Sequence, residues 1–534
     1  GGGAGDARMG ARGPIVHFLS PIVQVFRGIL CDNLHVMKIR SHLAAFCCLA
    51  AAFAADAGEA VRPAVRWRGF NLDGKAIKGK FSGTWDVRDL ALMREWGFNF
   101  ARVMIDYRYF CRPGTFEPDA ALFPPIDELI GWGRTYGIHI QICFSIPPGV
   151  DYAVSRSKKA ILEDPALVRA NVACWAFFAH RYRDVPAEAL SFNLFNEPSG
   201  DCDEAAYVAF IGACEKAIHA ASSARFIVAD GVQTARRPVR GALPASVGQS
   251  LHLYDPMEIS HYRAPWCRRE RAWPAPQWPP VPVTSPLYGS RKKDLAEPMA
   301  IGQVPACRLE IVPGLVNRLA ELVVKADGRE LGRTRYAPQT RAPGYTNMVA
   351  RSNGEWAGVP VAAFALDVPA CARLEIGMDR GDWMEVAALV FAADGRTARL
   401  APSYRWRTPG EPARTAVRFA GWDAPQAFVK EDGTAFTDAD YLRGVVFAPW
   451  EDVLASGRFV MVGETGVFNR TPHAVALAWL ESLLKELKAR GIGWALWNFR
   501  GPFGPLDSNR ADVEYEDFRG HRLDRKMLEL LRRY

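Results

Sequence analysis

Residues 191–198 read Ser-Phe-Asn-Leu-Phe-Asn-Glu-Pro, an apolar stretch that ends in a carboxylate and a proline. Residues 460–466 read Val-Met-Val-Gly-Glu-Thr-Gly and follow the same plan, with a carboxylate directly after the apolar run. Short apolar runs bounded by Gly or Pro are typical of buried strands. We therefore expect each strand to present one carboxylate, Glu197 or Glu464, at its carboxyl end.

Around these two stretches, short apolar runs alternate with longer amphipathic ones, a pattern typical of parallel strands joined by helices. The predicted strands are Val65–Phe70, Phe98–Ile105, Ile138–Phe144, Ala189–Phe195, Phe226–Ala229, Gln249–Leu253, Arg458–Val462 and Ile492–Trp497. The predicted helices are Val87–Trp96, Pro125–Tyr136, Pro165–Tyr182, Asp203–Ala220, Asp438–Ser456, Pro472–Arg490 and Arg522–Arg532. Eight such units predict an α/β fold, the (β/α)₈ TIM barrel, with a doubly wound open sheet as the alternative.

The alternation is interrupted between the sixth and seventh predicted strands. Residues 266–299 are rich in proline, which predicts a linker without regular structure. Residues 300–425 alternate apolar and polar side chains and contain Asp327-Gly328 and Asp394-Gly395, both typical of two-residue hairpin turns. We predict an inserted β-sandwich, with the barrel in two parts at 58–265 and 426–534. The strands expected in the insertion are Arg308–Val312, Glu321–Lys325, Arg373–Ile376, Val386–Phe391 and Thr415–Phe419.

The N-terminal region has the order of features of a bacterial export signal. From Met37, basic residues precede the apolar run 43–54, and Ala55-Asp56-Ala57 has the small residues of a cleavage site. A buried N-terminal helix is the alternative. We expect residues 37–57 to be a signal peptide, residues 1–36 to lie upstream of the true start, and the mature protein to be secreted or periplasmic, with no membrane attachment.

Charge and cysteine content exclude several other classes of partner. The net charge of +8 is spread along the 534 residues with no long basic run, so no nucleic-acid partner is expected. The eight cysteines after residue 57 show no metal-ligand spacing, so we expect no metal or organic cofactor. A disulfide between Cys307 and Cys371 stays open, and we expect a monomer.

Glu197 and Glu464 suggest one kind of chemistry. In a TIM barrel, residues at the carboxyl ends of the strands form the active site. Glycoside hydrolysis uses two carboxyl groups, one to protonate the leaving oxygen and one to meet the positive charge that develops on the sugar. Strands four and seven lie across the barrel from each other, so their carboxylates can approach. The alternative, that each is a surface ion pair, is weaker for two at matching strand ends.

The chain resembles glycoside hydrolase family 5, the cellulase-type family of retaining (β/α)₈ glycosidases, over residues 65–265 and 437–534. The resemblance rests on Asn196-Glu197-Pro198, on Glu464 in Gly-Glu-Thr-Gly, on His252 and Tyr254 in His-Leu-Tyr-Asp-Pro, and on Arg102 and Trp497. It implies that Glu197 is the acid/base and Glu464 the nucleophile. It further implies that Arg102 and Tyr254 hold the nucleophile, that His252 lies near the acid/base, that Asn196 bonds a sugar hydroxyl, and that Trp497 is the aromatic platform. We expect Glu464 to be kept ionised and Glu197 to hold a less stabilised charge.

One position departs from the family. Where many relatives have a histidine after strand three, this chain has Ser145, which leaves open how the sugar nearest the cleaved bond is held. The main hypothesis is a secreted endo-acting glycosidase, endo-β-1,4-glucanase-like, that acts on a β-glucan, cellulose or mannan polysaccharide or oligosaccharide. The alternative is a protein that binds polysaccharide through tryptophans of the insertion, such as Trp356, Trp383, Trp406 and Trp422, with little or no hydrolysis.

Overall fold

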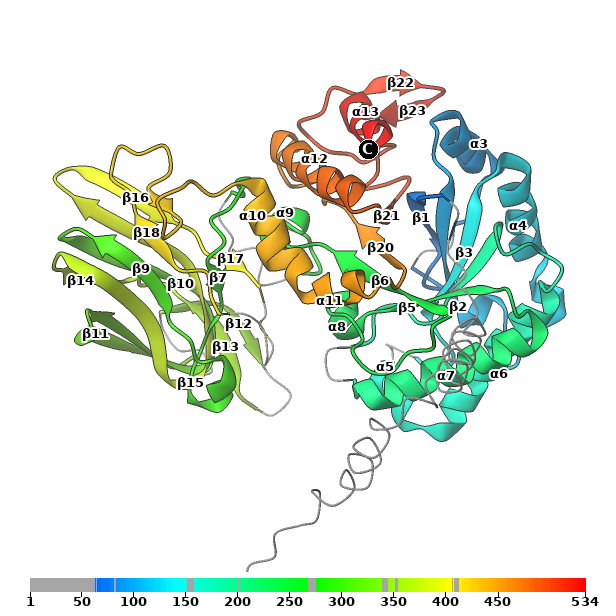
Figure 1. The fold of residues 1–534 in the computed structure, drawn as a ribbon, viewed down its shortest axis with the longest axis horizontal. Helices are drawn as coiled ribbons and strands as arrows, with labels where there is room; N and C mark the ends of the chain where they lie inside the picture. Colours follow the sequence, from blue (N-terminus) through cyan, green and yellow to red (C-terminus); the bar gives the residue numbers. More distant parts are fainter. Residues whose placement is uncertain are drawn as a thin grey trace, which may run out of the picture. The chain divides into compact units, whose positions relative to one another are not determined.

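The computed structural model describes residues 63, 65–80, 83–150, 158–199, 202–267, 275–338, 344–350, 354–405, 407 and 413–534 (Figure 1). The chain divides into two units, Gly1–Ala60 and Val61–Tyr534, and all described residues belong to the second. The predicted upstream segment and export signal therefore lie outside the described residues. None of the helices in the described part is long and apolar enough to cross a membrane.

Eight parallel strands close into a barrel in the order β1-β2-β3-β4-β5-β6-β20-β21. Their bounds are Arg68–Lys75 (β1), Phe100–Asp106 (β2), His139–Ile146 (β3), Leu190–Asn193 (β4), Phe226–Asp230 (β5), Val247–Leu253 (β6), Val460–Thr465 (β20) and Gly493–Leu496 (β21). The ring closes where β1 pairs with β21, with Arg68 opposite Trp494. An open sheet has no such pairing, so the predicted TIM barrel is confirmed.

Helices flank the barrel strands on their outer side (Figure 1). They are α3 (Val87–Glu95), α4 (Pro124–Tyr136), α5 (Lys158–Glu163), α6 (Pro165–Arg181), α7 (Glu204–Ala221), α8 (Val232–Ala235), α9 (Met257–Ser260), α12 (His473–Ala489) and α13 (Arg525–Arg533). Aspartate side chains accept backbone N–H groups at the start of α3, α6, α7 and α13. The apolar faces pack on the strands, as where Trp175 of α6 stacks on Phe144 of β3 at 3.9 Å between ring centroids.

The helix predicted at Asp438–Ser456 is divided into four short pieces. They are α10 (Asp438–Tyr441), a π-helical stretch (Leu442–Phe447), a 3₁₀ turn (Ala448–Trp450) and α11 (Glu451–Ala455). Pro449 lies within the 3₁₀ turn and has no N–H to donate. A continuous α-helix is therefore interrupted at this proline.

The insertion between β6 and β20 is a large β-sheet region with its own core, as predicted, and most of its strands join into one 11-stranded sheet. Its strands are β8 (Leu287–Tyr288), β9 (Met299–Val304), β10 (Cys307–Ala326), β11 (Arg329–Tyr336), β12 (Tyr345–Ala350), β13 (Trp356–Pro360), β14 (Phe364–Val368), β15 (Cys371–Ala393), β16 (Arg396–Leu400), β18 (Val417–Phe419) and β19 (Phe428–Val429). The four strands predicted within residues 308–391 are halves of two long ones, β10 and β15. The pairing between β10 and β15 passes Pro313 through a shift in register.

Both predicted hairpin turns are present in the insertion. Asp327-Gly328 joins β10 to β11, and Asp394-Gly395 joins β15 to β16. The φ angles of 46° and 80° at the first turn, and of 51° and 75° at the second, are those of the tight turn that Asp-Gly favours.

The proline-rich segment 266–299, predicted to lack regular structure, forms short elements in its described part. β7 (Thr284–Ser285) pairs with β17 (Ser403–Tyr404), β8 pairs with β15, and a 3₁₀ helix spans Ser290–Leu295. Two-residue strands need few N–H donors, so prolines between them are tolerated. The guanidinium of Arg414 also donates to the carbonyl oxygens of Thr284 and Pro286.

Six cysteines of the described region are buried, and these six are free thiols. Cys307 and Cys371 are among the buried ones, at the first residues of β10 and β15. Burial and the neighbouring Cys371 raise the pKa of the Cys307 thiol to about 11. The disulfide left open between these two residues is not formed here.

Candidate active site

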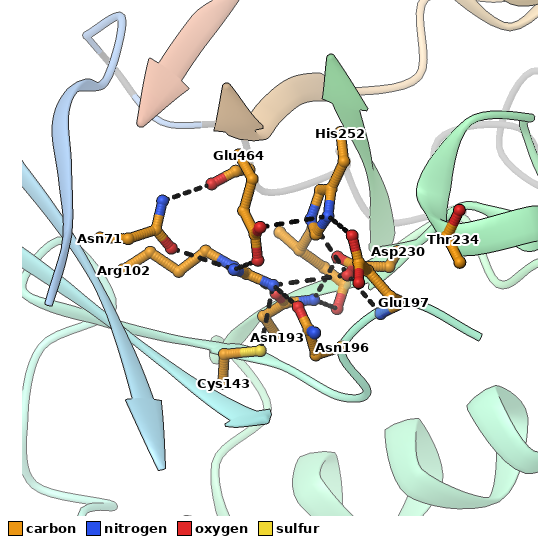
Figure 2. Close-up of polar contacts among 12 residues, drawn as sticks. Asn71, Arg102, Cys143, Asn193, Asn196, Glu197, Asp230, Thr234, His252 and Glu464 are labelled. Atoms are coloured by element: carbon orange, nitrogen blue, oxygen red, sulfur yellow. Dashed lines mark hydrogen bonds and ion pairs between the residues drawn. The ribbon is translucent and has the colours of Figure 1, made fainter. Parts of the chain in front are cut away.

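The carboxyl ends of the barrel strands bring the predicted polar residues together (Figure 2). Glu197 follows β4, and Glu464 lies in β20 opposite His252 of β6. The contacts below show that Arg102, Asn196 and Tyr254 reach the same place. The barrel therefore assembles side chains that lie up to 362 positions apart in the sequence.

Arg102 on β2 is at the centre of this cluster and is fully buried. Its Nη1 donates to Glu464 Oε1 at 2.7 Å, and its Nη2 donates to Asn196 Oδ1 at 2.8 Å. Its Nε donates to Asn193 Oδ1 at 2.8 Å, and Nη1 also reaches Asn71 Oδ1 at 3.0 Å. The guanidinium group thus fixes four side chains from the ends of three other strands around it.

Both carboxylate oxygens of Glu464 receive a donor. Arg102 occupies Oε1, and the Tyr254 hydroxyl donates to Oε2 at 3.1 Å. The Glu464 side chain is 8% exposed, and the guanidinium and the hydroxyl both favour a negatively charged group between them. Its position matches the role that the resemblance implied for a held carboxylate.

Glu197 has a left-handed backbone, with a φ angle of 47°. This conformation is unfavourable for a non-glycine residue and is held by its surroundings. The Glu197 N–H donates to Asp230 Oδ2 at 2.9 Å, while Lys158 Nζ donates to the carbonyl oxygen of Asn196. The Glu197 carboxylate is 2.9 Å from His252 Nδ1 and is 31% exposed, so it faces solvent more than Glu464 does.

The separation of the two carboxylates distinguishes between the two forms of glycoside hydrolysis. One oxygen of Glu197, one of Glu464 and a ring nitrogen of His252 all lie within 4.8 Å of one another. Inverting enzymes keep their carboxyl groups about 6.5–9.5 Å apart to admit a water, whereas retaining enzymes hold them at about 5–5.5 Å. Two oxygens that approach within 4.8 Å are compatible with the retaining arrangement.

The same three side chains form the group of potential metal ligands found among the described residues. The guanidinium of Arg102 lies 2.7 Å from the carboxylate of Glu464 and would repel a cation there. His252 Nδ1 already contacts Glu197. The donor set is therefore better suited to charge pairing than to a metal ion.

Three residues of this cluster were not predicted as site residues from the sequence. Asp230, at the end of β5, receives N–H groups from Glu197 and Asn193 and lies 3.2 Å from His252 Nε2. Its position directly after a predicted strand could have identified it. Asn193 lies inside a strand, and Lys158 belongs to a distant helix, so neither carried a recognisable signal.

The charge on Glu197 is more stabilised than the sequence predicts. Burial alone would raise the pKa of Glu197, but the hydrogen bond and charge of His252 outweigh burial and lower it. Burial would lower the pKa of His252, yet Glu464 and Asp230 raise it to about 10. The expectation that Glu197 holds the less stabilised charge is therefore wrong for this arrangement, because His252 acts as its cationic partner.

The remaining predicted residues lie nearby with different exposure. Trp497 is half-buried and packs against two apolar clusters, one that contains Met104 and Cys143 and one that contains Phe468 and Phe503. Its place beside the cluster fits the predicted platform. Ser145 is buried, and its hydroxyl donates to the carbonyl oxygen of Ala76, so it is used inside the protein.

Two acidic groups at the mouth of a closed (β/α)₈ barrel, set close together and flanked by an arginine, are typical of glycoside hydrolases. Residues 58–278 match the Cellulase family, glycosyl hydrolase family 5, and the chain therefore contains a domain of this glycosidase family. A carbohydrate substrate is implied by this family. No curated protein sequence matches the chain.

One solved structure shows the same fold, and two others align with the chain at lower scores. A crystal structure of a glycoside hydrolase aligns over 88% of this chain and 99% of its own, with 21% identity and a TM-score of 0.56. Thermotoga maritima Cel5A, in complex with cellobiose, aligns over 89% of this chain and 99% of its own, with 14% identity and a TM-score of 0.49. A structure described as an endoglucanase aligns over 88% and 97%, with 11% identity and a TM-score of 0.47.

Proposed function

We propose that this protein is a retaining glycoside hydrolase that cleaves a β-linked polysaccharide of the β-glucan, cellulose or mannan type. Glu464 is the nucleophile and Glu197 the acid/base. The observation that carries this proposal is the approach of the two carboxylates to within 4.8 Å, across a barrel rim in which Arg102 holds only one of them.

In the first step, a Glu464 oxygen attacks the anomeric carbon while Glu197 gives its proton to the departing glycosidic oxygen. Arg102 and Tyr254 hold the Glu464 carboxylate so that it attacks without reorienting. In the second step, Glu197 takes a proton from water, and the water releases the sugar from Glu464. The product keeps the configuration of the substrate.

Glu197 and His252 share the proton that this cycle needs. In the free protein the pair is an ion pair, with the proton on the imidazole. A bound sugar covers the exposed part of the Glu197 carboxylate, and this added burial favours its neutral form. Once Glu464 is esterified, its negative charge is gone, which favours ionised Glu197, the base of the second step.

Neighbouring groups supply the sugar contacts in this proposal. The backbone N–H of Trp497 donates to Thr465, the residue after the nucleophile, so its ring is close enough to stack on the apolar face of a sugar. Asn196 Oδ1 is occupied by Arg102, which leaves its Nδ2 to donate to a sugar hydroxyl. We further propose endo-type cleavage, export from the cell and action as a monomer.

Separate Glu464→Gln and Glu197→Ala variants test the proposal on β-glucan, carboxymethyl cellulose, mannan and xylan. Glu163→Gln, on the exposed side of α5, is the matched control and keeps parental turnover. We expect both site variants to lose at least about 10³-fold in kcat on the polysaccharide that the parent cleaves. Azide should restore turnover of an activated aryl glycoside to Glu197→Ala, because azide replaces the water that needs a base. Parental turnover in both variants would refute the proposal.

A further inference from the structure

The insertion has a surface hollow of about 690 Å³ that has no part in the chemistry above. Four segments line it, namely Gln303–Pro305 at the end of β9, Asp327 in the β10–β11 turn, Ala370–Ala372 at the start of β15, and Phe419–Trp422 after β18. The hollow is therefore built by the sheet, from residues up to 119 positions apart (422 minus 303).

Aromatic rings form one wall of this hollow. Trp422 is half-buried, and its ring meets that of Phe419 edge to face, with centroids 4.9 Å apart. The insertion's Trp383, in contrast, is 5% exposed and belongs to the core. The structure thus separates two of the tryptophans that the sequence left undecided, and Trp422 is the one that borders open space.

Polar groups stand beside the aromatic wall. Asp327 accepts the backbone N–H of Arg373 at 2.8 Å through Oδ1 and that of Ala372 at 3.3 Å through Oδ2. Each carboxylate oxygen keeps a further lone pair, so the group is held in place and can still accept hydrogen bonds. Gln303 is exposed at the rim and offers both a donor and an acceptor.

An aromatic face next to a fixed carboxylate and an amide matches the chemistry of a neutral sugar. The apolar face of a pyranose covers an indole ring, while its hydroxyls donate to carboxylate oxygens and accept from amides. The carboxylate disfavours an acidic sugar, because it would repel a second negative charge. A shallow hollow suits a few sugar units of a longer chain.

We propose that this hollow is a second saccharide-binding site, which holds a neutral polysaccharide chain against Trp422 and Asp327. The choice of ligand rests on the proposed function, since the site would hold the same polymer that the barrel cleaves. Binding there raises the concentration of substrate near the protein without any step of catalysis.

The test uses the full chain with Glu464→Gln, so that the polymer is not degraded during the measurement. Binding to insoluble cellulose and mannan, and retardation in gels that contain soluble β-glucan, are compared with and without Trp422→Ala. Trp356→Ala is the matched control, because Trp356 is a half-buried tryptophan of the same insertion that does not line the hollow. We expect Trp422→Ala to weaken binding about tenfold, and the control to leave it unchanged.

A second variant tests the site independently, in case Trp422→Ala does not fold correctly. Asp327→Asn keeps a residue that tolerates the left-handed backbone of the turn, and we expect it to weaken binding severalfold. With Glu464 intact, Trp422→Ala should retain parental kcat on short soluble oligosaccharides. Unchanged binding in both variants, or no binding by the parent chain, would overturn the second site. Full turnover by Glu464→Gln would instead overturn the proposed function and leave the binding result standing.

Discussion

Replacement of His252 by asparagine tests how the site stores its catalytic proton. The His252 ring nitrogens lie 2.9 Å from Glu197, 3.2 Å from Asp230 and 3.7 Å from Glu464. The Glu197–His252 pair must carry one proton for the first step, whichever of the two groups holds it in the free protein. The upper limb of the pH profile of kcat/KM therefore reports the loss of this last proton.

The structure sets the size and the direction of the shift that we expect in the upper limb of the pH profile. In the parent, the last proton leaves with the pKa of His252, which is raised to about 10. Without the imidazole, Glu197 alone must hold it. A carboxyl group has an ordinary pKa of about 4.3, and the rise that burial causes still leaves it well below the pKa of this imidazolium. The upper limb should therefore move down by at least about 2 pH units.

The assay measures kcat/KM from pH 4 to 10 for the parent and for His252→Asn on the same soluble oligosaccharide. Tyr254→Phe is the matched control, since it removes a hydroxyl that contacts Glu464 and not Glu197. We expect the control to lower the rate and leave the upper limb in place. An upper limb that stays or moves up in His252→Asn would refute the shared-proton reasoning.

Three further predictions concern the surroundings of the site and the packing of the barrel. Lys158→Met removes a cation that helps to lower the pKa of Glu197. We therefore expect the release of sugar from the nucleophile to slow about tenfold on activated aryl glycosides, measured as kcat, while the initial burst is retained. An unchanged kcat would contradict this role. Asp230→Asn removes a buried charge facing two cationic groups, and denaturant unfolding should show a loss of about 3 kcal/mol or more, whereas a parental midpoint would speak against it. Gly69→Ala places a Cβ 1.7 Å from a backbone oxygen of β2 and should lower the free energy of unfolding by about 1–3 kcal/mol. Gly131→Ala lies in open space on α4 and should raise the free energy of unfolding by about 0.5–1 kcal/mol. Equal denaturation midpoints for the two variants would refute the packing argument.

The barrel was predictable because each strand carries its own local signal. Glu197 and Glu464 follow apolar runs directly, and the carboxyl ends of parallel strands meet at one rim, so their proximity follows from topology. Asp230 has the same position after β5 and could have been found by the same rule. Lys158 could not, because its ammonium reaches Asn196 from the start of a helix, and nothing in its local sequence marks that contact.

The state of Glu197 shows a second limit of sequence reasoning. An acid needs a weakly stabilised charge, so the sequence analysis expected Glu197 to hold the less stabilised charge even with His252 near it. The structure places His252 against it, and the proton belongs to the pair. Such coupling depends on distances of a few ångströms between residues 55 positions apart, which no local pattern encodes.

The insertion shows where local patterns mislead about the length of strands. The alternating runs and both Asp-Gly turns were recognised correctly, but the predicted strands are shorter than β10 and β15, which continue past Pro313 and Gly381. Pairing between these two strands continues across both residues through shifts in register. Cross-strand partners, and not the local sequence, decide where such strands end.

The stereochemistry of cleavage tests the central claim most directly. Proton NMR can follow hydrolysis of a soluble β-linked oligosaccharide by the parent chain and detect the first anomer formed, before mutarotation. Carboxylates as close as those of Glu197 and Glu464 predict that the β-anomer appears first. Initial appearance of the α-anomer would show inversion and contradict the role of Glu464 as nucleophile.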